Sequence, residues 1–148
     1  MPANPDFRDL FAAFNAAQVR YLLVGGYALA FHGRPRFTKH LDVWLEPNAE
    51  NAESAYAALE AFGAPLQELH AGDLERPGLI FQIGVAPNRI DILTAIDGVT
   101  FGDAWSERQE TRYADQTVQV ISRYHLIVNK RATGRPRDLL DAEELEKK

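Results

Sequence analysis

Two acidic residues lie inside short apolar strand patterns, and this feature most constrains what the chain can fold into. Asp42 lies in segment 41–45 and Asp91 in segment 89–93, and both segments are otherwise dominated by apolar residues. A carboxylate among apolar neighbours costs free energy unless it is paired or bound to a metal. Because side chains alternate between the faces of a strand, His40 and Asp42 should project to the same side. If the two strands are neighbours, Asp91 approaches them, and the pair of carboxylates predicts a bound divalent cation.

A pair of glycines follows the first predicted strand. Residues 19–24 are mostly β-branched, aromatic or leucine, which predicts a buried strand, and Gly25 and Gly26 come directly after it. Glycine allows backbone amides to approach a phosphate closely, and the start of the following helix adds a positive dipole. The pair therefore predicts a phosphate cradle, with an ordinary strand-to-helix turn as the alternative.

Periodicity and capping residues predict alternating helices and strands that end in helices. Helices are expected over residues 5–17, 27–32, 49–62, 101–107, 122–132 and 136–146, and strands over 19–24, 41–45, 79–85, 89–93, 109–113 and 117–121. This pattern predicts an α/β or α+β fold, with a mixed β-sheet and helices packed on it. A length of 148 residues, an apolar content of 46% and no internal repeat favour a single domain over residues 1–148.

Composition excludes several classes of protein. The chain has no cysteine, which excludes a disulfide scaffold, a thiol nucleophile and a zinc ribbon. The longest stretch without charged or strongly polar residues, 21–31, is too short to cross a bilayer, and the first residues lack the pattern of a signal peptide. We therefore expect a cytoplasmic protein without a membrane partner. The net charge is −5, but residues 41–119 are strongly acidic and both flanking segments are mildly basic.

The order of these motifs resembles the DNA polymerase β-type nucleotidyltransferase superfamily. The features that carry the resemblance are a strand, Gly-Gly and a short helix, followed by Asp42 on the next strand and Asp91 on a later strand. Asp42 occupies the second position of the family's acidic-x-acidic pair, and Asp91 occupies the position of its third acid. The chain is most similar to the minimal, abortive-infection-toxin-like (AbiEii-like) branch. Two blocks support that branch, YALAFHGRPRFTK at residues 27–39 and Lys130 followed by GRPRDLLD at residues 134–141. The resemblance covers most of the chain and is least distinctive over residues 50–78.

The resemblance implies a polymerase β-like fold and metal-dependent transfer of a nucleoside monophosphate from a nucleoside triphosphate to a hydroxyl group. It implies that Asp42 and Asp91 bind Mg²⁺ (or Mn²⁺) and that Asp91 is also the base. Nucleotide contacts are implied for seven positions: Gly25, Gly26, Arg36, Lys39, Lys130, Arg135 and Asp138. For the charged residues among them the alternatives are a solvated loop, a surface lysine, or a helix cap in which Asp138 pairs with an arginine.

One position departs from the family pattern. His40 stands where the family has the first of its paired acids, so the catalytic set would be His40, Asp42 and Asp91. Imidazole nitrogen is a poor ligand for a hard ion such as Mg²⁺. The sequence leaves three explanations open: an engineered inactive variant, a natural pseudoenzyme, or a site in which His40 works with another metal such as Mn²⁺ or as a base. We expect impaired activity.

The resemblance favours an RNA 3′ end or a protein over a small molecule as the acceptor, and allows the toxin role of a toxin–antitoxin pair. An antitoxin partner or a homodimer could complete so short a chain. An alternative is an inactive nucleotide-binding or partner-binding module of the same fold. A further alternative is a small α/β domain with no nucleotide role, which opposite orientations of Asp42 and Asp91 would favour.

Overall fold

A mixed sheet with helices packed on it organises the part of the chain that the structure describes, and it confirms the predicted fold class. The computed structural model describes residues 3–34, 38 and 40–147. Six strands run in the order β3-β4-β2-β1-β6-β5. The strands are β1 (Tyr21–Val24), β2 (His40–Leu45), β3 (Ile80–Ile83), β4 (Arg89–Leu93), β5 (Gln109–Tyr113) and β6 (Gln116–Val120). The helices are α1 (Pro5–Ala16), α2 (Gly25–Phe31), α3 (Ala49–Phe62), α4 (Phe101–Ser106), α5 (Arg123–Thr133) and α6 (Pro136–Lys147), with a short 3₁₀ helix, η1, at Ala71–Glu75.

Both parallel and antiparallel pairs build this sheet. Strand β2 pairs antiparallel with β1 and parallel with β4, and β1 pairs parallel with β6. The hairpins β3–β4 and β5–β6 form the two edges. The two strands that carry the acidic residues, β2 and β4, are therefore neighbours, as the predicted cation site requires.

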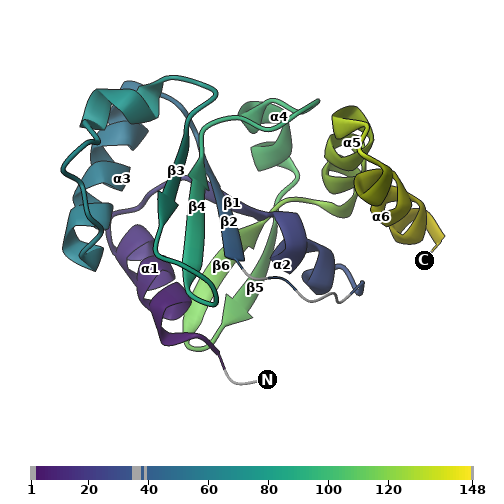
Figure 1. Ribbon diagram of the computed structural model, residues 1–148, viewed down its shortest axis with the longest axis horizontal. Helices are drawn as coiled ribbons and strands as arrows, with labels where there is room; N and C mark the ends of the chain where they lie inside the picture. The colour runs from purple at the N-terminus through teal and green to yellow at the C-terminus, as the bar shows by residue number, and fades with distance from the viewer. Residues whose placement is uncertain (1–2, 35–37, 39, 148) are drawn as a thin grey trace.

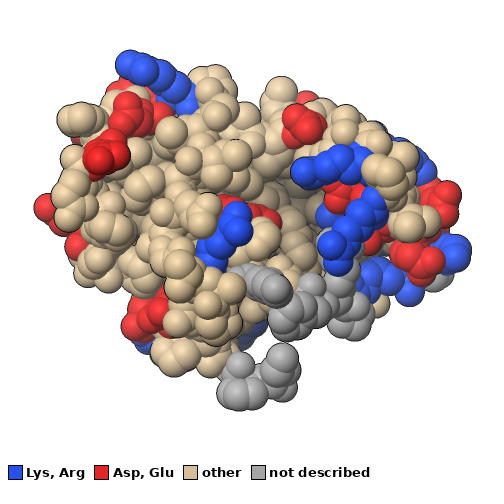
Figure 2. Space-filling model, in the orientation of Figure 1, with Lys and Arg blue, Asp and Glu red and all other residues tan. Residues whose placement is uncertain are grey.

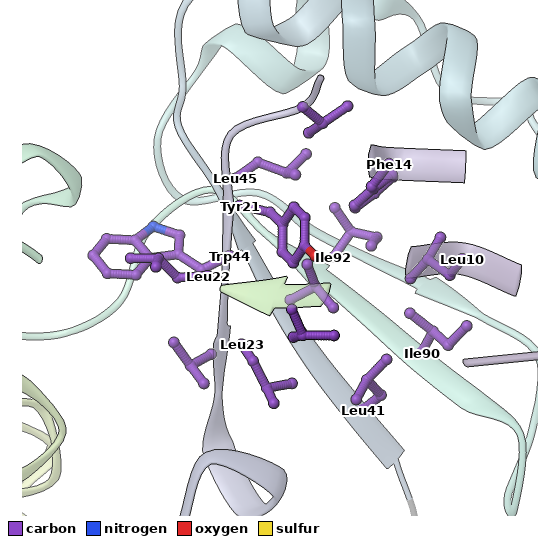
Figure 3. Close-up of a cluster of buried hydrophobic side chains, with 14 of the residues drawn as sticks. Leu10, Phe14, Tyr21, Leu22, Leu23, Leu41, Trp44, Leu45, Ile90 and Ile92 are labelled. Carbon is purple, nitrogen blue, oxygen red and sulfur yellow. The ribbon is translucent and has the colours of Figure 1, made fainter. Parts of the chain in front are cut away.

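Helices cover both faces of the sheet. In Figure 1, α1 and α3 lie on one side, and α2, α4, α5 and α6 lie on the other. The main core lies under α1, whose buried side chains recur at helical spacing and meet the strands, as Figure 3 shows for Leu10 and Phe14 beside Tyr21 and Ile92. Asn4 starts α1, because its side-chain oxygen accepts hydrogen bonds from the backbone N–H groups of Asp6 and Phe7.

Alternation along β2 divides its side chains between the two faces. Leu41, Val43 and Leu45 are fully buried in the core. Trp44 points with His40 and Asp42 to the opposite face, where it packs edge-on against Phe101 of α4. The apolar positions of β2 thus anchor the strand in the core and leave the polar positions on the face toward α2, α5 and α6.

The boundaries of the predicted helices and strands agree with the structure within two residues, and the two-residue shifts at the starts of α2 and β1 have local causes. Helix α2 begins at Gly25, two residues before the predicted start, because the glycine pair forms its first turn. Strand β1 begins at Tyr21 because Val19 still donates a backbone hydrogen bond to Phe14, closing the end of α1. The 3₁₀ helix η1 was not predicted. None of the described helices is long and apolar enough to cross a membrane.

Candidate active site

Asp42 and Asp91 lie directly opposite each other on neighbouring strands. The parallel register pairs Asp42 with Asp91 and His40 with Arg89, so these four residues occupy one face of β2 and β4. The side chains of Asp42 and Asp91 are only 16% and 7% exposed. The prediction that the two strands are neighbours is confirmed, and the opposite orientations that would favour a domain without a nucleotide role are not found for Asp42 and Asp91.

His40 completes a cluster with the two carboxylates. Its Nε2 lies 3.3 Å from Oδ1 of Asp42 and 3.9 Å from Oδ2 of Asp91. One potential ligand atom from each of the three residues lies within 4.8 Å of the other two. Atoms this close can surround a single cation.

Arg89 is a member of the site that the sequence analysis missed. Its Nε donates to Oδ1 of Asp91 at 3.0 Å and its Nη2 donates to Oδ2 at 2.8 Å, a two-pronged ion pair. The signal was available, because a residue two positions before Asp91 on the same strand must share its face. The guanidinium brings a positive charge to a group that a metal would also have to bind.

Burial and neighbouring charges perturb Asp42. Removal from water raises the pKa of this carboxyl group to about 6, and the nearby Asp91 charge acts in the same direction. His40, Arg89 and Lys130 oppose the rise by favouring the charged form. Asp42 is therefore held in a setting where a further positive charge would stabilise its carboxylate.

The glycine pair has a steric role beside these acids. A Cβ atom at Gly25 would lie 2.2 Å from Oδ2 of Asp42, and Gly25 has a φ of +71° that favours glycine. A Cβ atom at Gly26 would lie 2.9 Å from Cβ of Thr38. The two glycines allow the backbone at the start of α2 to sit against the Asp42 carboxylate. Whether they also cradle a phosphate stays a prediction.

A cavity of about 770 Å³ joins segments that are far apart in the sequence. Gly25 and Gly26 line it beside His40, Asp42 and Arg89, and α5 and α6 contribute the opposite wall. Figure 2 shows this hollow with acidic atoms in it and Lys or Arg side chains on both sides. Three of the predicted nucleotide contacts, Lys130, Arg135 and Asp138, belong to this wall, with Arg135 in the turn between α5 and α6. The predicted contacts Arg36 and Lys39 lie outside the described residues.

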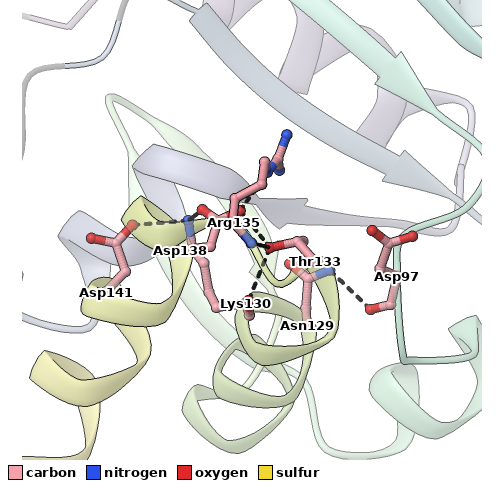
Figure 4. A network of polar contacts seen from close by, with 7 residues as sticks. All are labelled: Asp97, Asn129, Lys130, Thr133, Arg135, Asp138 and Asp141. Carbon is pink, nitrogen blue, oxygen red and sulfur yellow. Dashed lines mark hydrogen bonds and ion pairs between the residues drawn. The ribbon is translucent and has the colours of Figure 1, made fainter.

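Lys130 lies in a buried polar network between α5 and α6 rather than free in the cavity. Its Nζ lies 3.2 Å from Oδ1 of Asp138 and 3.2 Å from Oδ2 of Asp141, and its side chain is 7% exposed (Figure 4). The alternative of a surface lysine is therefore wrong. Its ammonium group already balances two carboxylates that join the two helices.

Asp138 is the centre of this network. It also accepts hydrogen bonds from Oγ1 of Thr133 at 2.7 Å and from Nε of Arg135 at 2.8 Å. Burial acts to raise the pKa of Asp138, but the Thr133 hydrogen bond and the charges of Lys130 and Arg135 outweigh it and leave the pKa lowered. The predicted ion pair between Asp138 and Arg135 is confirmed. The guanidinium of Arg135 also lines the cavity and is largely exposed.

Comparisons with known proteins agree with this geometry at the level of the fold. No protein-family model matches the chain, and no curated protein matches it. Solved structures do match over nearly the whole chain. The fold is that of nucleotidyltransferases. The resemblance inferred from the motifs is thus confirmed for the fold, and the abortive-infection branch stays a prediction.

Three of the matching structures illustrate the likeness. The lincosamide antibiotic adenylyltransferase LnuA, bound to lincomycin, has a TM-score of 0.58 at 15% identity, covering 98% of this chain and 97% of its own. ANT(2'')-Ia in complex with adenylyl-2''-tobramycin has a TM-score of 0.61 at 17% identity, covering 95% and 90%. A Thermotoga maritima protein described as a nucleotidyltransferase has a TM-score of 0.60 at 13% identity, covering 95% and 88%.

In this nucleotidyltransferase fold, His40, Asp42 and Asp91 are the residues that fit a divalent cation. They offer one imidazole nitrogen and carboxylate oxygens from two strands. Mg²⁺ prefers oxygen ligands alone, whereas several first-row transition metals accept both donor types. The two carboxylates fit the predicted Mg²⁺ or Mn²⁺, and the imidazole fits Mn²⁺ better than Mg²⁺.

Besides Arg89, the cavity wall contains polar residues that were not selected from the sequence motifs. They are Thr38, Asp97, Asn129, Thr133 and Arg137. Asn129 holds the loop after β4 through a hydrogen bond from its side chain to the backbone oxygen of Asp97. Arg137 could have been found in the same GRPRD block as Arg135. Asp97 and Asn129 had no signal, because only the packing of α5 against that loop brings them to the site.

Proposed function

We propose that this protein is a metal-dependent nucleotidyltransferase that moves a nucleoside monophosphate from a nucleoside triphosphate to a hydroxyl acceptor. The observation that carries the proposal is Asp42, which lies opposite Asp91 in the sheet and lines a charged cavity beside Gly25 and Gly26 in a nucleotidyltransferase fold. Paired carboxylates beside a cavity with basic side chains are suited to phosphoryl chemistry, in which positioning and charge neutralisation provide most of the catalysis. We treat residues 1–148 as a single domain for this activity.

The reaction balances as an in-line displacement at phosphorus. The acceptor oxygen forms a bond to the α-phosphorus, the bond from that phosphorus to the bridging oxygen of the β-phosphate breaks, and pyrophosphate leaves. A bound divalent cation would neutralise charge on the phosphate oxygens. The acceptor proton passes to a carboxylate. We assign this role to Asp42 instead of Asp91, because Arg89 already donates to both oxygens of Asp91.

The wall formed by α5 and α6 supports a triphosphate site. Arg135 and Arg137 both line the cavity, and guanidinium groups suit phosphate oxygens. Lys130 and Asp138 would act indirectly, because their charged groups contact each other and hold the helices together. Arg36 and Lys39 remain proposed phosphate contacts by family resemblance.

The acceptor is proposed from the resemblance, with an RNA 3′ end or a protein hydroxyl ahead of a small molecule. Two of the matching structures contain lincomycin and adenylyl-2''-tobramycin. Antibiotics are therefore the small molecules to test as acceptors. A toxin role, an antitoxin or homodimer partner and a cytoplasmic location belong to the same proposal.

A second function has a specific observation in its favour. His40 replaces an expected acid, and the Arg89 guanidinium neutralises Asp91, so the site carries less negative charge than three acids would provide. Such a site suits a module that binds a nucleotide or a protein partner without transferring anything.

Label transfer separates these functions. The protein and its His40→Asp variant are incubated with each α-³²P-labelled triphosphate, Mg²⁺ or Mn²⁺, and total RNA, total protein or antibiotics. We expect the His40→Asp variant to transfer label faster than the unmodified protein in Mg²⁺. If both proteins bind nucleotide and neither transfers label, nucleotidyl transfer is rejected as the function and the non-catalytic binding module is supported.

A further inference from the structure

The atoms of the three-residue cluster are spaced as ligands of one metal ion are spaced. A metal–ligand bond of about 2.1 Å with tetrahedral or octahedral angles places neighbouring ligand atoms roughly 3.0–3.4 Å apart. The separation of 3.3 Å between Nε2 of His40 and Oδ1 of Asp42 falls in this range. The 3.9 Å separation between Nε2 and Oδ2 of Asp91 exceeds it by about half an ångström, an adjustment that side-chain rotation can supply.

The same three residues offer a mixed donor set on a rigid base. His40 and Asp42 come from β2 and Asp91 from β4, and these strands pair over five residues at the centre of the sheet. Gly25 closes one side of the cluster, since no side chain larger than a hydrogen fits beside Asp42 there. The imidazole is 32% exposed, which leaves the site open to an ion from the cavity.

We propose that the site formed by His40, Asp42 and Asp91 selects a divalent transition-metal ion, such as Mn²⁺ or Zn²⁺, over Mg²⁺. This metal selectivity concerns the same site as the proposed nucleotidyl transfer, and it rests on that function only to this extent. An imidazole nitrogen binds Mn²⁺ weakly, Zn²⁺ more strongly and Mg²⁺ poorly, whereas carboxylates bind all three. Replacing one carboxylate of an all-oxygen set by imidazole therefore lowers the affinity for Mg²⁺ much more than the affinity for Zn²⁺.

Arg89 affects affinity without affecting selectivity. Its guanidinium lies on Asp91 and repels every divalent cation by the same Coulomb interaction, whatever the metal. It contributes no ligand atom, so it cannot discriminate between metals of equal charge. Charge and donor chemistry can thus be tested separately, the first at Arg89 and the second at His40.

The test measures metal binding directly, with no nucleotide and no turnover. Isothermal titration of the full chain with MgCl₂, MnCl₂ and ZnCl₂ gives the ratios of the dissociation constants. For His40→Asp we expect the Mg²⁺/Zn²⁺ ratio of dissociation constants to fall about tenfold or more, because removing even an indirect ligand partner changes metal affinity by about 10–100-fold. For Arg89→Gln we expect tighter binding of all three metals with the ratio unchanged.

His70 provides the matched control. Its side chain is 86% exposed and its Nδ1 lies 3.8 Å from Oδ2 of Asp73, so it is a second histidine beside an acid, and it does not line the cavity. His70→Asp should leave all metal ratios unchanged. Circular dichroism of each variant confirms folding before titration.

Equal Mg²⁺/Zn²⁺ ratios in the unmodified protein and His40→Asp would overturn the proposal, as would a loss of selectivity in His70→Asp. These outcomes are distinct from failure of the proposed function. If label is transferred in Mg²⁺ and the protein shows no metal preference, the proposed enzymatic function is supported and the proposed metal selectivity is wrong. If the protein binds metals selectively but transfers label to no acceptor, the metal selectivity is supported and the enzymatic function is wrong.

Discussion

At the scale of single residues, the site contains two carboxylates that are costly to bury. Asp42 is a largely buried carboxylate, and the buried Asp91 is paired with the Arg89 guanidinium. Burial of such groups costs free energy that an apolar residue would avoid. Groups held in this way are typical of functional sites. Gly25 adopts the left-handed conformation that glycine tolerates, which lets the backbone lie against Asp42.

Asp42→Asn should stabilise the protein while removing its activity. Burial raises the pKa of Asp42 from 3.8 to about 6, so folding favours the protonated form. Its contribution to stability is present below about pH 4 and is lost as the pH rises through about 6, which corresponds to about 3 kcal/mol at most. Urea unfolding in EDTA should therefore show the variant more stable than the parent at pH 8 and equally stable near pH 4. A variant less stable than the parent at pH 8 would contradict this.

Gly25→Ala should displace Asp42. The new Cβ would meet Oδ2 of Asp42 at 2.2 Å, and the φ of +71° adds backbone strain. Gly33→Ala is the matched control, because Gly33 has a φ of +90° but no atom of the described residues lies within 4 Å of its Cβ position. We expect the control to lose about 1–2 kcal/mol of unfolding free energy. Gly25→Ala should lose more, and it alone should weaken Mn²⁺ binding. Equal effects of both variants on Mn²⁺ binding would refute the steric role.

At the scale of elements, buried ion pairs join α5 to α6. Lys130 on α5 lies between Asp138 and Asp141 on α6, and all three side chains are at most 13% exposed. A buried ion pair is costly to break from one side, because the buried carboxylates lose the positive charge that balances them. This network positions the start of α6, from which Arg135 and Arg137 reach the cavity.

Lys130→Met should destabilise the fold strongly. The substitution leaves the carboxylates of Asp138 and Asp141 without the ammonium group, at an expected cost of about 3–5 kcal/mol. Arg131→Met is the control on the next residue, since Arg131 pairs with Glu146 at the surface. The control should change stability by less than about 1 kcal/mol. Guanidinium chloride unfolding measures both, and similar losses would show that the Lys130 network is not a special contact.

Element prediction from the sequence worked where local signals decide. Asn4 and Ser122 cap helices as their side chains allow, and Gly63 ends α3 in the left-handed conformation that favours glycine. Element prediction missed η1 and placed the start of α2 two residues too late. At the start of α2 the backbone of Gly25 lies against the Asp42 side chain, a contact between distant segments that local propensity does not encode.

At the scale of the whole molecule, the cavity exists because three distant parts of the chain meet. The turn from β1 into α2, the polar face of β2 and β4, and the start of α6 all line it. The strands carry Asp42, Asp91 and Arg89. The helical wall carries Lys130, Arg135, Arg137 and Asp138, so charges of both signs lie on both sides of the site. Figure 2 shows both signs at the same hollow.

Removing the arginines of the helical wall should weaken nucleotide binding and spare the metal site. We expect Arg135→Gln combined with Arg137→Gln to weaken ATP binding by about tenfold, since each exposed charge contributes modestly. The control is Lys147→Gln, at the far end of the same helix, where Lys147 pairs with Glu144. Fluorescence titration with a labelled ATP analogue measures both. A loss of ATP affinity in the control equal to that in the double variant would argue against a triphosphate site at this wall.

The sequence by itself determined the mixed α/β fold and most element boundaries, because hydrophobic periodicity and caps act over short distances. It also predicted the grouping of Gly25, Asp42 and Asp91, because their motifs follow the order of a known family. The placement of His40 beside both acids followed from alternation along β2 once β4 was its neighbour. Only the tertiary structure decided that Lys130 is buried between two aspartates and that Asp97 and Asn129 line the cavity. These partners depend on strand register and helix docking, which many weak contacts across the whole chain settle together.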